Sequence, residues 1–295
     1  MRPGVTSAFN MVHGRIRVSS PPQRVLDILT EICLSEGWCP DRSEGREMAE
    51  RWQDQVCALI RNEINQLREL GRFVHYDFNA SSSYMLQGAA YIAETDTADA
   101  RLEKERLTEV DEYFAAISEL TPRLFEALCT GILSELGVPA PVQTPYSGDE
   151  GIDFYGRMTL DKLLAPDALY PGVESQFSVW MIGQAKHYQK GAISTFHIRE
   201  LVGAVELAKR GAFSIREQGY IQPPVRSCDA VFYLFFTTGQ MTAPSWRLIE
   251  ESGVIGMDGT MIAAFIARRA RTLAEGTVAE RLSLWLSPFI RAVET

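Results

Sequence analysis

From about residue 121 onward, the sequence alternates between short apolar runs and longer amphipathic segments. The apolar runs are rich in Val, Ile, Phe and Tyr, which favour strands, and the amphipathic segments carry apolar residues at helical spacing. We predict strands over residues 152–156, 179–186, 230–237 and 254–257, together with helices over 121–136, 195–209, 244–251, 260–269 and 278–286. This alternation is typical of an α/β fold in which helices flank a mixed β-sheet.

Before residue 121 the pattern is mainly helical. The longest amphipathic segment, 44–70, carries an apolar stripe, and Gly71 follows it as a typical helix stop. Further helices are predicted over 21–33, 85–93 and 98–120, with a polar turn at 79–83 and one short strand-like segment at 72–78. We therefore predict an α-helical N-terminal domain over residues 1–118 and an α/β domain over residues 119–295.

The composition, with 46% hydrophobic and 23% charged residues, is that of an ordinary globular chain. No apolar run approaches the roughly 20 residues that a membrane-spanning helix needs, and the N-terminus lacks the hydrophobic core of a signal peptide. The five cysteines include no C-x-x-C pair, which favours reduced thiols over a disulfide framework or a zinc site. We expect a cytoplasmic protein without membrane contact.

The net charge of -9 is distributed unevenly along the chain. Residues 1–120 contain 13 Lys and Arg against 20 Asp and Glu, whereas residues 121–295 contain 16 against 18. Within residues 181–216 the sign reverses, with a surplus formed by Lys186, Lys190, Arg199, Lys209, Arg210 and Arg216. This surplus suits phosphate contacts, although scattered charges also occur on solvated helix faces. The acidic N-terminal domain would repel a nucleic acid, so we expect it to mediate homo-oligomerisation or contact with a protein partner.

A polar pair ends an otherwise apolar strand in the segment VWMIGQAKHY, which spans residues 179–188. Gln184 and Lys186 are two positions apart, so their side chains lie on one face of the strand. Asp153 stands at the entry to the preceding predicted strand, and Glu126 lies on the helix before it. If the two strands pair, a carboxylate, an amide oxygen and an ammonium group meet at one edge. That set suits hydrolysis of a phosphodiester with Mg²⁺, which proteins bind through one or two carboxylates and neutral oxygens.

Each of these residues also has a simpler explanation. The polar end of the strand can mark its arrival at solvent, Asp153 can belong to a turn, and Glu126 can be an exposed helical glutamate. His187 and His197 are more typical of packing or surface histidines than of metal ligands or bases. No Ser-His-Asp arrangement, phosphate-binding loop or dinucleotide-binding glycine pattern in the sequence indicates another class of enzyme.

Five segments between residues 120 and 267 form a recognisable series. They are TPRLFEALCTGILSELG, GDEGIDFYG, IGQAKHY, ISTFHIRELVGAVELAK and AVFYLFFTTGQMTAPSWRLIEESGVIGMDGTMIA. In this order they resemble the catalytic domain of Mrr-like restriction endonucleases, a branch of the PD-(D/E)xK nuclease superfamily in which Gln often replaces the acidic residue before x-Lys. The resemblance implies a restriction-endonuclease-like fold, a mixed β-sheet flanked by helices, preceded here by the α-helical N-terminal domain.

The resemblance also implies roles for the residues that match the family motifs. Asp153, Gln184 and the backbone carbonyl of Ala185 would bind Mg²⁺, for which Mn²⁺ is a candidate substitute. Lys186 would position the attacking water, and Glu126 would support the metal site from its helix. Two features depart from the family: the segment between Asp153 and Gln184 is longer than the usual turn, and the N-terminal region does not resemble the basic winged-helix domain of some relatives.

The resulting hypothesis is a Mg²⁺-dependent DNA endonuclease acting on double-stranded DNA, with Lys190 and Arg199 as candidate phosphate contacts. We expect a role in restriction or in defence against foreign DNA. A DNA repair or junction-processing nuclease is the alternative with the same chemistry. A non-catalytic module that binds DNA or protein through the same fold is a further alternative, which the joint presence of all four candidate catalytic residues disfavours.

Overall fold

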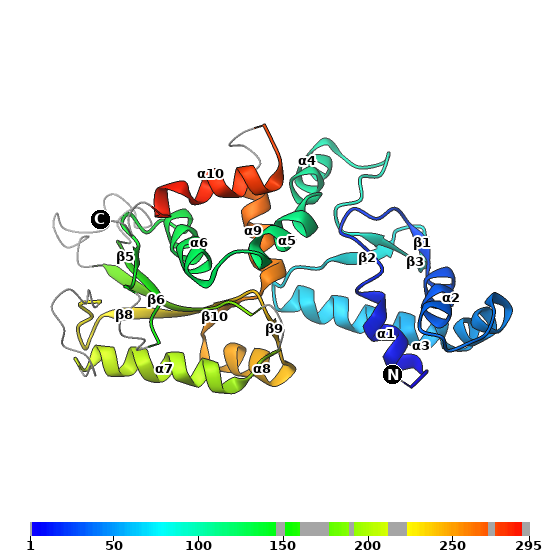
Figure 1. Ribbon diagram of the computed structural model, residues 1–295, viewed down its shortest axis with the longest axis horizontal. Helices are drawn as coiled ribbons and strands as arrows, with labels where there is room; N and C mark the ends of the chain where they lie inside the picture. Colours follow the sequence, from blue (N-terminus) through cyan, green and yellow to red (C-terminus); the bar gives the residue numbers. More distant parts are fainter. Residues whose placement is uncertain are drawn as a thin grey trace. The chain divides into compact units, whose positions relative to one another are not determined.

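The computed structural model describes residues 2–145, 151–159, 177–188, 192–211, 223–270 and 275–290. The chain divides into two compact units, and most of their helices and strands are labelled in Figure 1. The first unit comprises Met1–Tyr113 and Ala263–Arg271, and the second comprises Phe114–Ile262 and Thr272–Thr295. Among the described residues, no helix is both long and apolar enough to cross a membrane.

The first unit is built mainly from helices, as predicted. They are α1 (Val5–Val12), α2 (Val25–Ser35), α3 (Arg42–Glu69) and α4 (Ala98–Leu107), with the start of α5 (Val110–Ser118) and the end of α9 (Gly259–Ala270). A small antiparallel sheet accompanies them, with strands β1 (Gln23–Arg24), β2 (Tyr76–Asn79) and β3 (Ser82–Gly88) in the order β1-β3-β2. The strand-like segment predicted at 72–78 overlaps β2, whereas β1 and β3 are additions to the predicted helical region.

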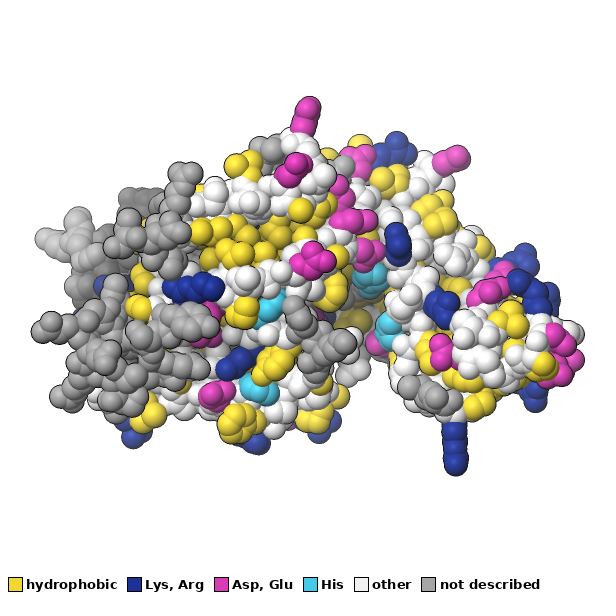
Figure 2. All heavy atoms as spheres, in the orientation of Figure 1, with side chains coloured by type: hydrophobic (Ala, Val, Ile, Leu, Met, Phe, Trp, Pro, Cys, Tyr) yellow, Lys and Arg dark blue, Asp and Glu magenta, His cyan; other side chains and the backbone are white. Residues whose placement is uncertain are grey.

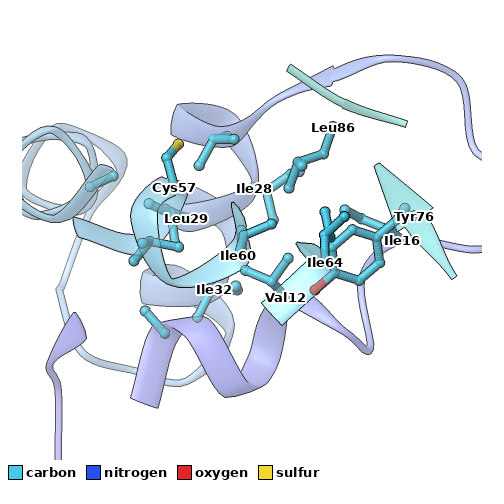
Figure 3. Close-up of a cluster of buried hydrophobic side chains, with 14 residues drawn as sticks. Val12, Ile16, Ile28, Leu29, Ile32, Cys57, Ile60, Ile64, Tyr76 and Leu86 are labelled. Carbon is cyan, nitrogen blue, oxygen red and sulfur yellow. The ribbon is translucent and has the colours of Figure 1, made fainter. Parts of the chain in front are cut away.

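The core of the first unit gathers apolar side chains from α1, α2, α3 and the small sheet (Figure 3). Ile28, Leu29 and Ile32 of α2 belong to it together with Ile60 and Ile64 of α3, and each is at most 5% exposed. Burying one such side chain contributes about 1.5–3 kcal/mol relative to leaving it in water. The stripe predicted on the longest helix is therefore the face that holds this unit together.

The helix predicted over residues 85–93 is wrong, because its first half forms the end of β3. Leu86 pairs with Phe78 of β2 on one side and with Gln23 of β1 on the other, and its side chain is fully buried. The local composition MLQGAA favours a helix, but pairing with two strands distant in the sequence decides the conformation. The same pairing explains why α2 begins at Val25 rather than at the predicted residue 21.

The single helix predicted over residues 98–120 is also wrong, because two helices, α4 and α5, occupy this segment. The Thr108 hydroxyl donates a hydrogen bond to the carbonyl of Glu105 at 2.9 Å. This bond satisfies one of the carbonyls that the end of a helix leaves without a partner. Helix α4 ends at Leu107, and α5 starts at Val110.

The second unit contains a five-stranded mixed sheet in the order β10-β8-β6-β5-β4 (Figure 1). Its strands are β4 (Val142–Gln143), β5 (Phe154–Thr159), β6 (Ser178–Lys186), β8 (Ala230–Thr237) and β10 (Ile255–Met257). Strands β6, β8 and β10 are parallel, whereas β5 is antiparallel to both of its neighbours. A separate parallel pair is formed by β7 (Ala192–Ile193) and β9 (Gln240–Met241). The predicted mixed sheet is confirmed.

Helices cover both faces of this sheet (Figure 1). On one face α6 (Pro122–Glu135) contacts β5 and β6 and is itself contacted by α10 (Val278–Ile290); on the other lie α7 (Thr195–Lys209) and α8 (Ala243–Ser252). The chain passes from β6 through α7 to the parallel strand β8, which is a crossover connection. Residues on the α7 face of β6 include Trp180 and Ile182, which share a buried cluster with side chains of α7.

Helix α10 is longer than predicted, because it continues through Pro288 to Ile290 rather than ending at residue 286. A proline has no N–H, so the carbonyl of Leu284 loses its normal helical partner. The hydroxyl of Ser287 donates to that carbonyl at 2.8 Å instead. A neighbouring side chain therefore satisfies the group that the proline leaves free, and the helix does not stop.

Candidate active site

Gln184 and Lys186 lie at the carboxyl end of β6, on the face that α7 covers. Side chains of a strand alternate between its faces, so both residues share the face of Trp180 and Ile182. The Lys186 Nζ lies 3.5 Å from the Oε2 of Glu200, which belongs to α7. The polar end of this strand is thus covered by a helix and has not simply reached bulk solvent.

Asp153 immediately precedes β5 and is held opposite Gln184. Its N–H donates to the carbonyl of Gly183 at 3.0 Å, and its Oδ2 accepts a hydrogen bond from the N–H of Ala185 at 2.7 Å. The N–H and C=O of a strand residue point to the same side, so the carbonyl of Ala185 is directed toward β5 as well. The structure therefore brings the Asp153 carboxylate, the Gln184 side chain and the Ala185 carbonyl to one edge of the β5–β6 pair.

The side chain of Gln184 is fully buried, and neither polar atom has a hydrogen-bond partner among the described residues. Gly151, whose φ is +76°, passes close to it: a Cβ atom at Gly151 would lie 3.4 Å from the Gln184 Nε2. Leaving a buried amide without a partner costs about 1–3 kcal/mol. Such a group in a native protein calls for a ligand, an ion or a water as its partner.

Glu126 lies on α6, where two side chains hold its carboxylate. Its Oε2 is 2.7 Å from the guanidinium of Arg123 and accepts a hydrogen bond from the Nε2 of Gln143 at 3.0 Å. The nearby thiol of Cys129 has a pKa raised well above its usual range, first by burial and then by the carboxylates of Asp153 and Glu126. Both carboxylates therefore lie close enough to act on the same buried thiol.

The end of β6 is fixed by hydrogen bonds to the end of β8. The Thr237 hydroxyl and the N–H of Thr238 donate to the Lys186 carbonyl at 2.7 and 3.3 Å. The Thr238 hydroxyl lies 3.0 Å from the Nδ1 of His187, whose ring packs against Phe125 with a centroid distance of 5.5 Å. Burial lowers the pKa of His187. This histidine packs against α6, as expected from the sequence. The hydrogen bonds to the Lys186 carbonyl hold the backbone of that residue in place.

The candidate phosphate contacts are described in part. Arg199 lies on the exposed side of α7, and its Nη1 donates to the hydroxyl of Thr195 at 3.4 Å. Lys190 and the GDE residues 148–150 lie outside the described residues, as does the long segment 160–176. Basic and acidic side chains are interspersed on the face drawn in Figure 2.

Exposed aromatic rings lie near the end of β6. The side chains of Tyr188 and Phe196 are 37% and 67% exposed. Both rings pack edge-on against His197, with centroid distances of 5.9 and 5.8 Å, and the Tyr188 hydroxyl lies 3.1 Å from the His197 Nε2. In this ring cluster of Tyr188, Phe196 and His197, Tyr188 follows Lys186 by two residues, and the other two rings belong to the first turn of α7. His197 is a surface-packing histidine, as expected.

Glu200 was missed by the sequence reasoning. It lies in ISTFHIRELVGAVELAK, one of the five segments that resemble the family, but the sequence pattern by itself assigns this glutamate no role. A signal did exist: a helix that connects two parallel strands must cover one face of the sheet, and Gln184 and Lys186 share a face. Which residue of α7 reaches Lys186 depends on the packing of helix on sheet, and the sequence pattern does not specify it.

The donors at this edge are oxygens rather than a cluster of acidic or sulfur ligands. Among the described residues, no group of three or more His, Cys, Asp and Glu side chains is arranged to hold a metal ion. Asp153 supplies a carboxylate, Gln184 a buried amide and Ala185 a carbonyl. Mg²⁺ is commonly bound by one or two carboxylates together with neutral oxygens and water. The amide of Gln184, which has no partner among the described residues, and the carboxylate opposite it therefore fit a hard divalent cation.

A family model described as restriction endonuclease, the Mrr catalytic domain, matches residues 117–218. The predicted resemblance is thereby confirmed for this segment. It contains Glu126, Asp153, Gln184 and Lys186, and it begins close to the start of the second unit. The match supports nuclease activity for the second unit.

Two solved restriction endonucleases are similar to the chain. One is the MspJI restriction endonuclease in complex with a 27-mer oligonucleotide, with a TM-score of 0.41, 15% identity and coverage of 70% of this chain and 40% of that one. The other is the DNA modification-dependent restriction endonuclease AspBHI, with a TM-score of 0.40, 16% identity and coverage of 73% and 47%. The chain thus spans less than half the length of either protein. A search of curated proteins found no match.

Proposed function

We propose that this protein is a divalent-metal-dependent DNA endonuclease whose active site lies at the ends of β5 and β6. The observation that carries the proposal is the buried amide of Gln184, which lies between Asp153 and Lys186 and has no partner among the described residues, within a segment that matches a restriction endonuclease family model. A buried polar group without a partner is costly, so it is expected to have a ligand in the working protein.

The residues that would hold the metal are Asp153, Gln184 and the backbone carbonyl of Ala185. We propose Mg²⁺ as the ion, with Mn²⁺ able to replace it, because all three donors are oxygens. Bound there, the ion would stabilise negative charge on the phosphoryl oxygens and lower the pKa of a coordinated water. Glu126 would support the site indirectly, since Arg123 and Gln143 already hold its carboxylate on α6.

Lys186 is the proposed catalytic residue that orients the attacking water. Its ammonium group lies at the same edge as Gln184. Thr237 and Thr238, at the end of β8, donate hydrogen bonds to its backbone carbonyl. An ammonium held in one position can orient the attacking water and offset the negative charge that develops on the phosphate. The carboxylate of Asp153, which accepts a hydrogen bond from Ala185, would keep its own orientation throughout the reaction.

We propose that double-stranded DNA passes over the exposed start of α7. Arg199 and Lys190 would contact phosphates, which position the backbone without reading the sequence. The ring cluster of Tyr188, Phe196 and His197 lies beside this path, and exposed aromatic rings bind sugars or unstacked bases. Interspersed acidic side chains favour a few defined contacts over binding through a broad basic surface (Figure 2).

We propose that the biological role is restriction or defence against foreign DNA in the cytoplasm. Free thiols at all five cysteines suit that compartment. Residues 119–295 would form the nuclease domain. Residues 1–118 would mediate homo-oligomerisation or bind a protein partner, since 13 Lys and Arg face 20 Asp and Glu in residues 1–120. Light scattering on the full chain tests self-association, and a monomer at micromolar concentration would leave only the partner option.

The proposed activity is tested by incubating the purified protein with plain plasmid, methylated plasmid and a four-way junction, each with Mg²⁺ or with EDTA. We expect metal-dependent cutting of plasmid. Preferential cutting of the junction would support the repair role instead. DNA binding without cutting of any substrate in Mg²⁺ or Mn²⁺ would support the non-catalytic alternative and contradict the proposal.

A further inference from the structure

Two cysteines of the first unit lie close together where helix α2 leads into helix α3. Cys33 lies in the last turn of α2 and is fully buried, whereas Cys39 lies in the loop before α3 and is half-buried. The chain turns back at Gly37, whose φ is +66°, and the N–H of Trp38 donates to the carbonyl of Cys33 at 2.9 Å. The turn therefore returns the chain to the end of α2 just before Cys39.

A glycine on α3 leaves the space in which the two side chains meet. A Cβ atom at Gly45 would lie 2.9 Å from the Sγ of Cys39 and 3.6 Å from the Cβ of Cys33. Both cysteine side chains thus lie within 4 Å of one point beside α3. Glycine is a poor helix former, and the close approach of the Cys39 sulfur gives a physical reason for its place in the early turns of this long helix.

The two thiols also influence each other electrostatically. Burial raises the pKa of Cys33, and the neighbouring Cys39 raises it further. Burial also raises the pKa of Cys39, with smaller contributions from the carboxylates of Asp41 and Glu44. Both groups are therefore protonated at neutral pH. Because the thiolate is the reactive form, we expect this pair to react slowly with an oxidant at neutral pH and faster as the pH rises.

We propose that Cys33 and Cys39 form a reversible disulfide, which makes the junction of α2 and α3 an oxidation site for peroxide. This inference is independent of the proposed nuclease function. The half-buried Cys39 thiolate attacks peroxide, so that an S–O bond forms, the O–O bond breaks and a protonated water leaves as H₂O. The Cys33 thiolate then attacks the Cys39 sulfur, so that the S–S bond forms, the S–O bond breaks and a second water leaves. The two sulfurs are oxidised, and peroxide is reduced to two waters.

The disulfide joins the two helices whose packing builds much of the core of the first unit. A cross-link removes conformations from the unfolded chain, so the oxidised first unit is more stable than the reduced one. Thiols in the cytosol are normally kept reduced, and disulfides that form there are typically transient responses to oxidation. The pair therefore stabilises the junction of α2 and α3 only under oxidising conditions.

The first test follows both thiols within a single peptide. Tryptic cleavage after Arg24 and Arg42 releases residues 25–42, which contain Cys33 and Cys39. The reduced full-length protein is treated with hydrogen peroxide, the remaining thiols are alkylated, and the tryptic peptides are analysed by mass spectrometry. We expect this peptide to lose two hydrogen atoms and to escape alkylation, and dithiothreitol is expected to restore its reduced mass.

Cys228 is the internal control, because it is exposed and lies in the separate tryptic peptide 227–247. At low protein concentration, an exposed thiol without a second cysteine beside it is oxidised to sulfinic or sulfonic acid, which dithiothreitol does not reverse. We expect that outcome at Cys228. In the variant Cys39→Ser, the buried Cys33 is expected to stay reduced and to be alkylated after unfolding.

Gly45→Ala tests the geometry of the pair. The added methyl group would lie 2.9 Å from the Cys39 sulfur, so the sulfur must leave its position beside Cys33, whereas the helix gains a better helix former. We expect the disulfide to form about 3-fold or more slowly than in the wild type. Gly203→Ala is the matched control, because nothing lies within 4 Å of a Cβ atom at that position of α7, and its rate is expected to equal that of the wild type.

Urea unfolding gives a second readout. We expect oxidation to raise the unfolding midpoint of the first unit by about 0.5 M or more in the wild type and to leave it unchanged in Cys39→Ser. A disulfide without this shift would contradict the stabilising role. If peptide 25–42 carries sulfinic or sulfonic acid, or is still alkylated at both cysteines when Cys228 is fully oxidised, the pair is not a disulfide site and the inference fails. Neither result bears on cleavage of DNA by the second unit.

Discussion

Two buried polar side chains, Tyr76 in the first unit and Gln184 in the second, differ in whether they have a hydrogen-bond partner among the described residues. In the first unit, the Tyr76 hydroxyl lies 3.1 Å from the Nδ1 of His13, and the Nε2 of the same histidine lies 3.4 Å from Glu63. In the second unit, the buried amide of Gln184 has no partner among the described residues. A closed network is explained by folding alone. An open one indicates that something else completes it, and the contrast is why we assign catalysis to the second unit.

Asp153→Asn is expected to give the largest effect. The variant keeps an oxygen that can accept the hydrogen bond from Ala185, so the fold is preserved, but it loses the negative charge opposite Gln184. We expect cleavage to fall by about 10³-fold or more, with the unfolding transition unchanged. Plasmid cleavage and denaturant unfolding check the two halves of this prediction. A stable variant that cuts within 3-fold of the wild-type rate would contradict the assigned metal ligand.

Gln184→Met tests the buried amide that has no partner among the described residues. Methionine has a similar shape and no polar atoms that need partners, so we expect the free energy of unfolding of the apo protein to rise by about 1–3 kcal/mol. Activity is expected to fall at the same time, because the amide oxygen is gone. Urea unfolding without added metal, combined with cleavage assays, measures both. A destabilised variant would indicate that the amide has a structural partner in the folded chain.

Tyr76→Phe tests the hydrogen-bonded network of the first unit. Tyr76 is 3% exposed, and burial together with the nearby Glu63 raises the pKa of its hydroxyl. Removing the hydroxyl takes away the partner of the His13 Nδ1, so we expect a loss of about 0.5–1.5 kcal/mol in stability and no change in cleavage. Urea unfolding checks the first expectation. Reduced cleavage in the folded variant would show that the first unit takes part in the reaction.

The smallest expected effect is on the pH dependence of the stability of the first unit. Burial lowers the pKa of His75 below its usual 6.5, although Asp111 at 3.3 Å opposes the shift. The unfolded chain therefore binds this proton more readily, so the stability contributed by neutral His75 is complete above pH 6.5 and declines as the pH falls below it.

His75→Gln isolates this contribution. The charged groups that act on His75 are Asp111 and His13. Burial raises the pKa of Glu63, and a raised carboxyl pKa adds stability as the pH falls, which opposes the effect of His75. We expect the stability of the wild type to decline more than that of the variant between pH 7.5 and 5.5. Urea midpoints at several pH values measure this difference. Parallel pH curves for the two proteins would show that His75 does not titrate with folding.

The parts of the fold that local patterns determine were predictable. The strands at 179–186 and 230–237 and the helix at 195–209 match β6, β8 and α7 within one residue, because buried apolar runs and amphipathic stripes decide those elements. The segment 85–93 was mispredicted, because β3 exists only through pairing with β1 and β2. Helix α10 was predicted too short, because a serine hydroxyl compensates for Pro288.

The residues of the candidate site that stand in local sequence motifs were predictable as well. Asp153, Gln184 and Lys186 stand in motifs whose spacing along paired strands brings them together. Glu200 was not predictable, since its contact with Lys186 depends on how α7 lies across β6.

The most direct test of the central claim is plasmid cleavage by Lys186→Ala beside the control Lys209→Ala, each with Mg²⁺ and with EDTA. Lys209 lies on the same unit in an ion pair with Glu206, so the control removes an equal charge away from the site. The account predicts metal-dependent cutting by the wild type and by Lys209→Ala, and a loss of about 10²-fold or more in Lys186→Ala. Equal cutting by both variants would contradict the assignment of catalysis to this edge of the sheet.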